Sequence, residues 1–124
     1  MAKISLLLDT DIFIDYFNTG RFHALFDSSR FTVYYSIITK KELLTKPGLR
    51  DNERTAILAE LTRCRLIALT ESIAARYSDL RRRYPSLEQS DALIAATALV
   101  KRLPLLTRNR RHFRMVTELT LFGA

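Results

Sequence analysis

Short apolar runs alternate with amphipathic stretches along the chain, and several runs end at an acidic or amide side chain. Residues 4–9 form an apolar run that ends in Asp9, which predicts a buried strand. Residues 31–36 are rich in aromatic and β-branched side chains and predict a second strand. Further strands are predicted at residues 65–69, 105–106 and 119–122.

Apolar residues at helical spacing occupy the segments between the predicted strands. Helices are expected over residues 11–17, around Phe22, Leu25 and Phe26, over residues 39–44, after Asp51, after Thr70 and over residues 91–101. Asp51 and Thr70 are typical N-cap residues. Pro85 ends the helix that Thr70 begins, because proline cannot continue the hydrogen-bond ladder. Thr39 and Glu42 match the capping-box pattern of a helix start.

The alternation of strands and helices predicts an α/β fold. We expect a three-layer arrangement in which a mostly parallel sheet of about four to five strands is covered by helices on both faces. Residues 91–101 are apolar nearly all round, so their helix is expected to be buried on several sides. The length of 124 residues and the scattered placement of three Gly and three Pro indicate one domain over residues 1–124.

The chain is strongly basic, with 15 Arg, 5 Lys and a formal net charge of +7. Guanidinium groups contact phosphate in a forked geometry, so the charge favours a nucleic acid as partner. An acidic partner protein is the alternative that the charge leaves open.

Cysteine content and hydropathy limit the cellular setting. The single Cys64 excludes an internal disulfide and a Cys-rich zinc site, and it is expected to be a small buried apolar residue. No apolar run approaches the roughly 20 residues needed to span a bilayer, so no membrane partner is expected. The run after Lys3 is too short for a signal peptide, which favours a cytoplasmic protein.

Four acidic or amide residues lie at the ends of apolar runs, two just past predicted strands and two in the first turns of predicted helices, where a parallel sheet would bring them together. They are Asp9, Glu42, Asp91 and Asn109. Ligands of such sheets bind outside the carboxyl ends of the strands, which is where these residues are expected. Converging carboxylates bind a hard divalent cation, and a buried carboxylate without a partner is costly.

Four sequence blocks around these residues resemble the PIN-domain ribonucleases, specifically the toxin subunits of VapBC toxin–antitoxin pairs. The blocks are LLDTD at 7–11, SIITKKELL at 36–44, DALIAATA at 91–98 and LTRNRRHF at 106–113. The resemblance implies a PIN-like fold and a Mg²⁺- or Mn²⁺-dependent endoribonuclease. It further implies a homodimer and a small antitoxin protein that occludes the active site.

The same resemblance implies roles for the site residues. Asp9 and Asp91 are expected as metal ligands, and Glu42 as the residue that maintains the geometry of the site. Many relatives have Asp where this chain has Asn109, and the neutral amide favours one metal over two. Auxiliary roles in binding metal, water or phosphate are considered for Asp11, Ser36, Thr107 and His112.

Structural explanations exist for several of these residues. Glu42 can be a capping-box residue and Asp91 a first-turn acid favoured by the helix dipole. Asp11 can be the N-cap of the following helix, and Thr107 can simply end a strand. His112 can be a solvated surface residue. The sequence leaves these alternatives open.

Two clusters of arginine are candidates for contact with RNA. Those beside the proposed site, expected to position phosphate groups, are Arg108, Arg110, Arg111 and Arg114. Residues 81–83 form a second basic run on a helix, for which a solvated surface is an equal explanation. The helices that carry Leu58, Leu61, Ile73 and Tyr77 are candidates for the homodimer interface.

Two other functions compete with the ribonuclease. A PIN domain that binds RNA without cleaving it is suggested by the missing fourth acid at Asn109. A Mg²⁺-binding receiver-like signalling domain would use Asp9 and Asp11. The late strand ends in Thr107 and Arg108 rather than in the lysine such a domain requires, and the positive charge also disfavours it.

Overall fold

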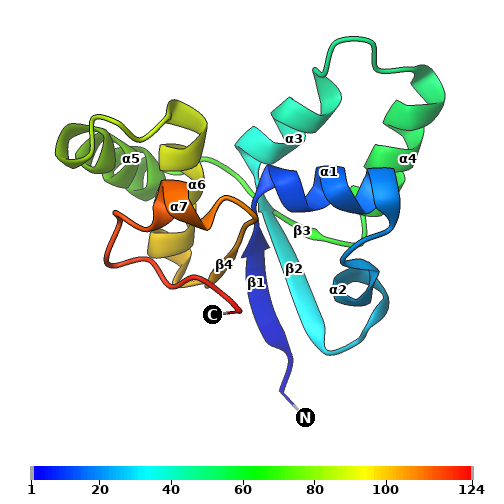
Figure 1. Cartoon of the computed structure of the whole chain (residues 1–124), viewed down its shortest axis with the longest axis horizontal. Coiled ribbons are helices and arrows are strands. Elements are labelled where there is room, and N and C mark those ends of the chain that lie inside the picture. The colour runs from blue at the N-terminus through cyan, green and yellow to red at the C-terminus, as the bar shows by residue number, and fades with distance from the viewer. Residues whose placement is uncertain (1, 124) are drawn as a thin grey trace.

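Four parallel strands form the central sheet of the computed structural model, which describes residues 2–123 (Figure 1). The strands are β1 (Ile4–Leu8), β2 (Phe31–Ser36), β3 (Arg65–Ile67) and β4 (Leu105–Leu106). Their order in the sheet is β3-β2-β1-β4, and every adjacent pair runs parallel. The predicted α/β class and parallel sheet are confirmed.

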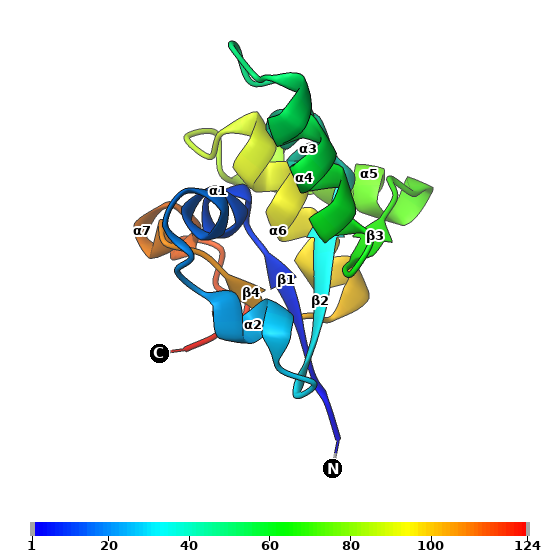
Figure 2. The ribbon, with the colours of Figure 1, turned by 90° about the vertical axis from the view of Figure 1, so that its right-hand side faces the viewer.

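Helices cover both faces of this sheet (Figures 1 and 2). One face is covered by α1 (Thr10–Thr19), α2 (His23–Asp27), α3 (Ile37–Leu44) and α4 (Asp51–Leu61). The other is covered by α5 (Glu71–Arg83), α6 (Gln89–Lys101) and α7 (Arg110–Phe113). Most of the buried residues of α6 are small or apolar, as expected of a helix that packs on several sides.

The hydrophobic core has two halves that meet at β1. Leu6 and Leu8 belong to the cluster beneath α1 to α4, whereas Leu7 belongs to the cluster beneath α5 to α7. Successive side chains of a strand point to opposite faces, and all three leucines are fully buried. The unbroken apolar run of β1 therefore follows from its burial on both sides.

The predicted start of the third helix is wrong. α3 begins at Ile37, and its N-cap is Ser36, whose Oγ accepts a hydrogen bond from the amide of Ile38 at 3.0 Å. Thr39 lies inside the helix and is fully buried. Glu42 is consequently not a capping-box residue, which removes that alternative for it.

Of two other predicted N-caps, that of α4 is wrong and that of α5 is confirmed. Asp51 is the first residue of α4 rather than its N-cap, which is Arg50, and the Arg50 amide donates to Glu53 Oε1 at 3.0 Å. Thr70 is the N-cap of α5 as predicted, and its Oγ1 accepts from the amide of Ile73 at 3.2 Å.

The predicted strand at 119–122 is wrong. This segment makes a single parallel bridge, between Leu121 and Leu105. Because β4 has only two residues, it offers too little edge for a longer ladder. The short helix α7 was not predicted, since four residues carry no recognisable period. β3 also ends earlier than predicted, at Ile67.

Two of the residues considered for a dimer interface lie in the core. Leu61 and Ile73 are 3% and 1% exposed. Leu58 is exposed and Tyr77 half-buried, so these two remain available on their helices. Cys64 is half-buried rather than fully buried, and burial raises the pKa of its thiol to about 12. Within residues 2–123, no helix has the length and apolar character that a bilayer crossing requires.

Candidate active site

The site lies where the order of strands reverses. β1 pairs with β2 on one side and with β4 on the other, so the helices that follow β1 and β4 diverge at the carboxyl edge of the sheet. Asp9 directly follows β1 and Thr107 directly follows β4. The Asp9 amide donates to the carbonyl of Leu106 at 2.9 Å, which fixes the two strand ends together.

Asp9 is the buried centre of the site, with 5% of its surface exposed. It is the N-cap of α1, and its Oδ1 accepts from the amide of Thr10 at 2.8 Å. Its Oδ2 accepts from the hydroxyl of Thr107 at 2.7 Å. Each carboxylate oxygen has two lone pairs, so Asp9 retains acceptor capacity for a further ligand.

Burial and neighbouring charge raise the pKa of Asp9 from 3.8 to about 7. Desolvation is the largest cause, and the negative charge of Asp11 comes next. The hydrogen bonds from Thr107 and Thr10 act in the opposite direction, and Asp91 adds a smaller increase. A carboxylate held this way is stabilised by a nearby cation.

Asp11 lies in the first turn of α1, so the alternative that it is the N-cap is wrong. Its carboxylate accepts from the amide of Arg108 at 3.2 Å, and the Thr107 hydroxyl lies 3.5 Å away. Burial raises its pKa, although the contacts with Arg108 act against this. The carboxylate of Asp11 therefore lies in the same cluster of acidic side chains as that of Asp9.

Glu42 is held by a chain of hydroxyl groups that the sequence analysis missed. Thr10 Oγ1 donates to Glu42 Oε1 at 2.7 Å, and Thr10 Oγ1 and Thr39 Oγ1 are 2.9 Å apart. The Thr10 hydroxyl has one hydrogen, which Glu42 receives, so Thr39 is the donor to Thr10. The sequence signal for the role of Thr10 is its position directly after Asp9.

Asp91 lies in the first turn of α6, and His112 on α7 faces it. His112 Nδ1 is 3.4 Å from Asp91 Oδ2. Burial raises the pKa of Asp91, His112 lowers it, and Glu88 and Glu42 raise it further. Asp91 is therefore close enough to Asp9 and to Glu42 for their charges to act on one another.

Asn109 and Ser36 contribute mainly to the local backbone. Asn109 is exposed and is the N-cap of α7. Its amide donates to the Thr107 hydroxyl at 3.0 Å, so its main chain helps to orient Thr107 toward Asp9. Ser36 is 1% exposed, and its hydroxyl caps α3.

The arginines beside the site differ in what they contact. Arg108 forms an ion pair with Asp15 on α1 at 3.4 Å. Asp15 also pairs with Arg21 at 3.5 Å. Arg110 donates to the carbonyls of Phe122 at 3.1 Å and Gly123 at 3.0 Å, so it holds the C-terminal segment. The remaining two members of the predicted cluster, both exposed, are Arg111 and Arg114.

The basic run at 81–83 is tied to its surroundings. Arg81 donates to the carbonyl of Leu87, Arg82 pairs with Asp79, and Arg83 pairs with Asp79 and with Glu118 at 3.0 Å. These contacts favour the alternative, a solvated surface run, over contact with RNA.

The side chains of the site include several that could bind a divalent metal. Within residues 2–123, no three His, Cys, Asp or Glu side chains lie close enough to enclose an ion by themselves. Mg²⁺ keeps several waters and is bound through one or two carboxylates, so an enclosed cluster is unnecessary. The buried Asp9, crowded by the charges of Asp11 and Asp91, fits such an open site.

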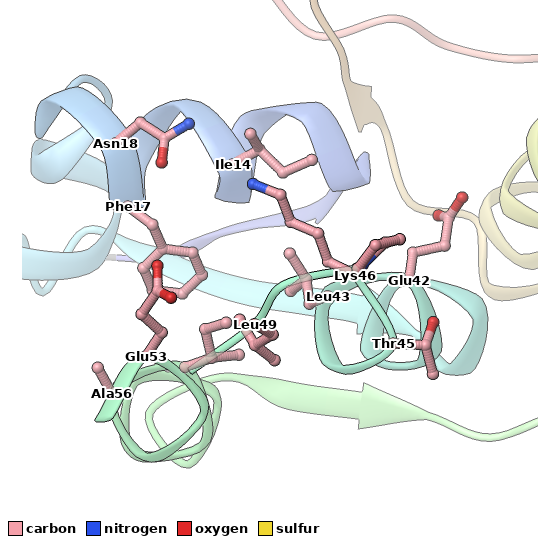
Figure 3. A pocket seen from close by; sticks show the side chains of 12 residues that line it. Ile14, Phe17, Asn18, Glu42, Leu43, Thr45, Lys46, Leu49, Glu53 and Ala56 are labelled. Atoms are coloured by element: carbon pink, nitrogen blue, oxygen red, sulfur yellow. The ribbon is translucent and has the colours of Figure 1, made fainter. Parts of the chain in front are cut away.

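An apolar pocket of about 560 Å³ adjoins Glu42 between α1, α3 and α4. Figure 3 shows Ile14, Phe17 and Leu49 around this space, with Glu42 at one end. Ile14 is 40% exposed there, so part of this large aliphatic side chain is open to solvent at the pocket.

Comparison with known proteins gives consistent matches. The model of the PIN domain matches residues 6–119. Ribonuclease VapC1 of Methanocaldococcus jannaschii is 29% identical over 121 residues, which are 94% of this chain and 84% of the relative. Ribonuclease VapC19 of Mycobacterium tuberculosis is 40% identical over 88 residues, which are 68% of this chain and 69% of the relative.

Solved structures show the same architecture. A toxin–antitoxin complex from Klebsiella pneumoniae contains a chain with 31% identity and a TM-score of 0.76, covering 93% of this chain and 95% of that one. VapBC2 from Rickettsia felis, bound to a promoter DNA fragment, has a TM-score of 0.81 at 21% identity, covering 95% and 97%. The second likeness concerns the fold alone.

Proposed function

This chain belongs to the PIN-domain family, where its relatives are VapC ribonucleases, and we propose that it is an endoribonuclease that hydrolyses RNA phosphodiester bonds. The observation that carries the proposal is Asp9, buried at the strand-order reversal and crowded by Asp11 and Asp91. Membership of the PIN-domain family argues against the alternative of a receiver-like signalling domain. One domain over residues 1–124 remains part of the proposal.

We propose that Mg²⁺ or Mn²⁺ binds at Asp9 and Asp91. Asp11 lies beside Asp9 and completes the negative charge of the site. When bound, such a metal lowers the pKa of a coordinated water and neutralises charge on the reacting phosphate. Asn109 is exposed and carries no charge, so the carboxylates that remain at the start of α1 and on α6 favour one bound metal over two.

The surrounding residues position these carboxylates. Thr107 holds Asp9 by a hydrogen bond of 2.7 Å, and Thr10 holds Glu42 by another of 2.7 Å. His112 faces Asp91 from the opposite helix. Phosphate contacts are proposed for the exposed Arg111 and Arg114 and for Arg108, whereas the carbonyl bonds of Arg110 occupy part of its guanidinium.

We propose further that the protein is the toxin of a toxin–antitoxin pair, and that the antitoxin covers the apolar pocket between α1, α3 and α4. This pocket ends at Glu42, so a segment bound there would lie beside the carboxylates. The Klebsiella pneumoniae structure similar to this chain is a toxin–antitoxin complex. A homodimer and a cytoplasmic location complete the proposal.

The test is cleavage of a structured RNA pool by purified protein, with Mg²⁺, with Mn²⁺ and with EDTA. Asp9→Asn and Asp91→Asn are purified identically and are expected to lose cleavage. Asp51→Asn, which removes an exposed acid on α4, is the matched control and should cleave normally.

Binding of RNA without cleavage in the presence of either metal would contradict the proposed ribonuclease activity and favour a PIN domain that binds RNA without cleaving it. Equal cleavage by the wild type and both site variants would indicate a contaminating nuclease.

A further inference from the structure

A second cavity, of about 460 Å³, is lined in part by Thr107, the residue that also donates a hydrogen bond to Asp9. We call it the arginine groove. Its lining comes from three separate parts of the chain: the α1–α2 connection with α2, the β4–α7 segment and the C-terminal segment. In Figure 2, α1, α2, α7 and the C-terminal end all lie toward the same side of the molecule.

The charge of the arginine groove is positive. Arg21, Arg108 and Arg110 line it. Within residues 2–123, Asp15 is the single carboxylate that pairs with any of the three, and Arg21 and Arg108 share it. The side chains of Arg21 and Arg108 are 62% and 49% exposed, so their guanidinium groups remain accessible to an anion.

Two aromatic rings accompany these charges. Phe22 and Phe122 line the groove, and both are only half-buried. The guanidinium of Arg21 lies over the Phe22 ring, 5.0 Å from its centroid. An unpaired RNA base stacks on aromatic rings and on guanidinium planes, so this pair offers such a surface.

The backbone at Phe22 is held in an unfavourable conformation. Its φ of +68° lies in the left-handed region, which bulky side chains rarely adopt. Phe22 occupies this position because the chain reverses directly after Gly20, the C-cap of α1, and then enters α2. Strain of this kind is common where a side chain is presented to a ligand.

The opposite wall of the groove is firmly attached. Arg110 donates to the carbonyls of Phe122 and Gly123, and the Phe122 amide donates to Leu105 at 2.8 Å. The C-terminal segment is thereby fixed to β4 at Leu105, two residues before Thr107. Thr107 lines the groove and also donates to Asp9, so groove and active site share one residue.

From this arrangement we infer that the arginine groove binds one unpaired nucleotide of the RNA substrate, next to the phosphate that is cleaved. Its base stacks on the pair formed by Phe22 and Arg21, and its phosphate contacts Arg108. The inference rests on the proposed ribonuclease function and names the part of the substrate that this groove recognises.

The first experiment measures binding of a fluorescein-labelled single-stranded RNA to protein carrying Asp91→Asn, which prevents cleavage. Phe22→Leu, which keeps the apolar bulk but removes the ring, is expected to weaken binding about tenfold. Phe22→Tyr keeps the ring and should bind like the parent. Arg108→Gln should lower the slope of log K against log salt by about 0.7, the value for one phosphate of a single strand. Arg30→Gln, outside the groove, should leave the slope unchanged.

A second experiment uses the wild-type protein, in case Phe22→Leu folds poorly. RNA containing 5-iodouridine couples on irradiation to aromatic side chains stacked against it. The expected crosslink lies in the tryptic peptide of residues 22–30. Crosslinks confined to other peptides would overturn the inference.

The outcomes separate this inference from the function on which it rests. Wild-type protein that cleaves RNA, with Phe22→Leu equal to it in affinity and rate, would overturn the groove and leave the ribonuclease intact. Wild-type protein that neither binds nor cleaves RNA would overturn both.

Discussion

Thr10 joins the two sides of the site because its amide and its hydroxyl serve different carboxylates. The amide donates to Asp9 and the hydroxyl to Glu42, while buried Thr39 supplies the hydrogen that the Thr10 oxygen accepts. Thr10 and Thr39 thus help to fix the direction in which Glu42 points. Such supporting hydrogen bonds commonly affect metal affinity or activity by about 10- to 100-fold.

Thr10→Val removes the hydroxyl but keeps the shape of the side chain, and we expect cleavage to fall about tenfold. Thr10→Ser retains the hydroxyl and should keep most of the activity. Single-turnover cleavage at saturating RNA is the measurement, because it separates the chemical step from RNA binding. A rate for Thr10→Val equal to that of Thr10→Ser would show that the hydroxyl chain does not position Glu42.

The raised pKa of Asp9 gives the metal-free protein a definite pH dependence. Between about pH 4 and pH 7, folded Asp9 keeps a proton that the unfolded chain has lost. The unfolding free energy therefore falls as pH rises through this window. The contribution of Asp9 is on the order of 4 kcal/mol, and the raised pKa values of Asp11 and Asp91 act in the same direction.

Urea unfolding in EDTA at pH 5 and pH 8 measures this effect. The wild type should be more stable at pH 5, and Asp9→Asn should show a smaller difference between the two values. Added Mg²⁺ at pH 8 should restore stability to the wild type because it binds the ionised carboxylates. Greater stability at pH 8 than at pH 5 without metal would contradict the burial of an uncompensated Asp9.

Helices and strands with a clear period were predictable, and those defined by single hydrogen bonds were not. β2 and α5 match their predicted positions because their apolar residues alternate or repeat at helical spacing. The start of α3 was misplaced because Ser36 and Thr39 are both good caps, and the burial of Thr39 decided between them. The segment at 119–122 has the composition of a strand but too short a partner.

The same distinction applies to the site. The sequence showed that Asp9 follows a strand and that Asp91 lies at the start of a helix, because the apolar runs next to them predicted that strand and that helix. The roles of Thr10, Asp15 and Arg110 were not, since they depend on contacts between segments far apart in the chain. Contact across a fold carries no local period.

The cap of α3 can be tested directly. Ser36→Ala should lower the unfolding free energy by about 1 kcal/mol, because the Ile38 amide loses its acceptor. Ser36→Asp supplies another acceptor and should be less destabilising than Ser36→Ala. Chemical denaturation followed by circular dichroism provides the comparison. No loss of stability in Ser36→Ala would mean that another residue begins the helix.

The positive charge of the whole molecule and the arginines at the site make separate contributions to RNA binding. A net charge of +7 attracts any polyanion, whereas a phosphate contact releases counterions at one place. Arg111 and Arg114 are both exposed; Arg111 lines the same hollow as Asp91, and Arg114 is the C-cap of α7. Arg30 directly precedes β2, at the opposite end of the strand from the site, and Arg65 begins β3.

Replacing Arg111 and Arg114 together with Gln removes the same charge as replacing Arg30 and Arg65 together. If the site arginines contact phosphates, the first pair should lower the slope of log K against log salt by about 1.4, and the second should change it little. The affinity of Asp91→Asn protein for single-stranded RNA, measured across a range of salt concentrations, gives both slopes. Equal changes in the two double variants would mean that RNA responds to the overall field of the protein, and the arginines at the site would then have no special role in binding.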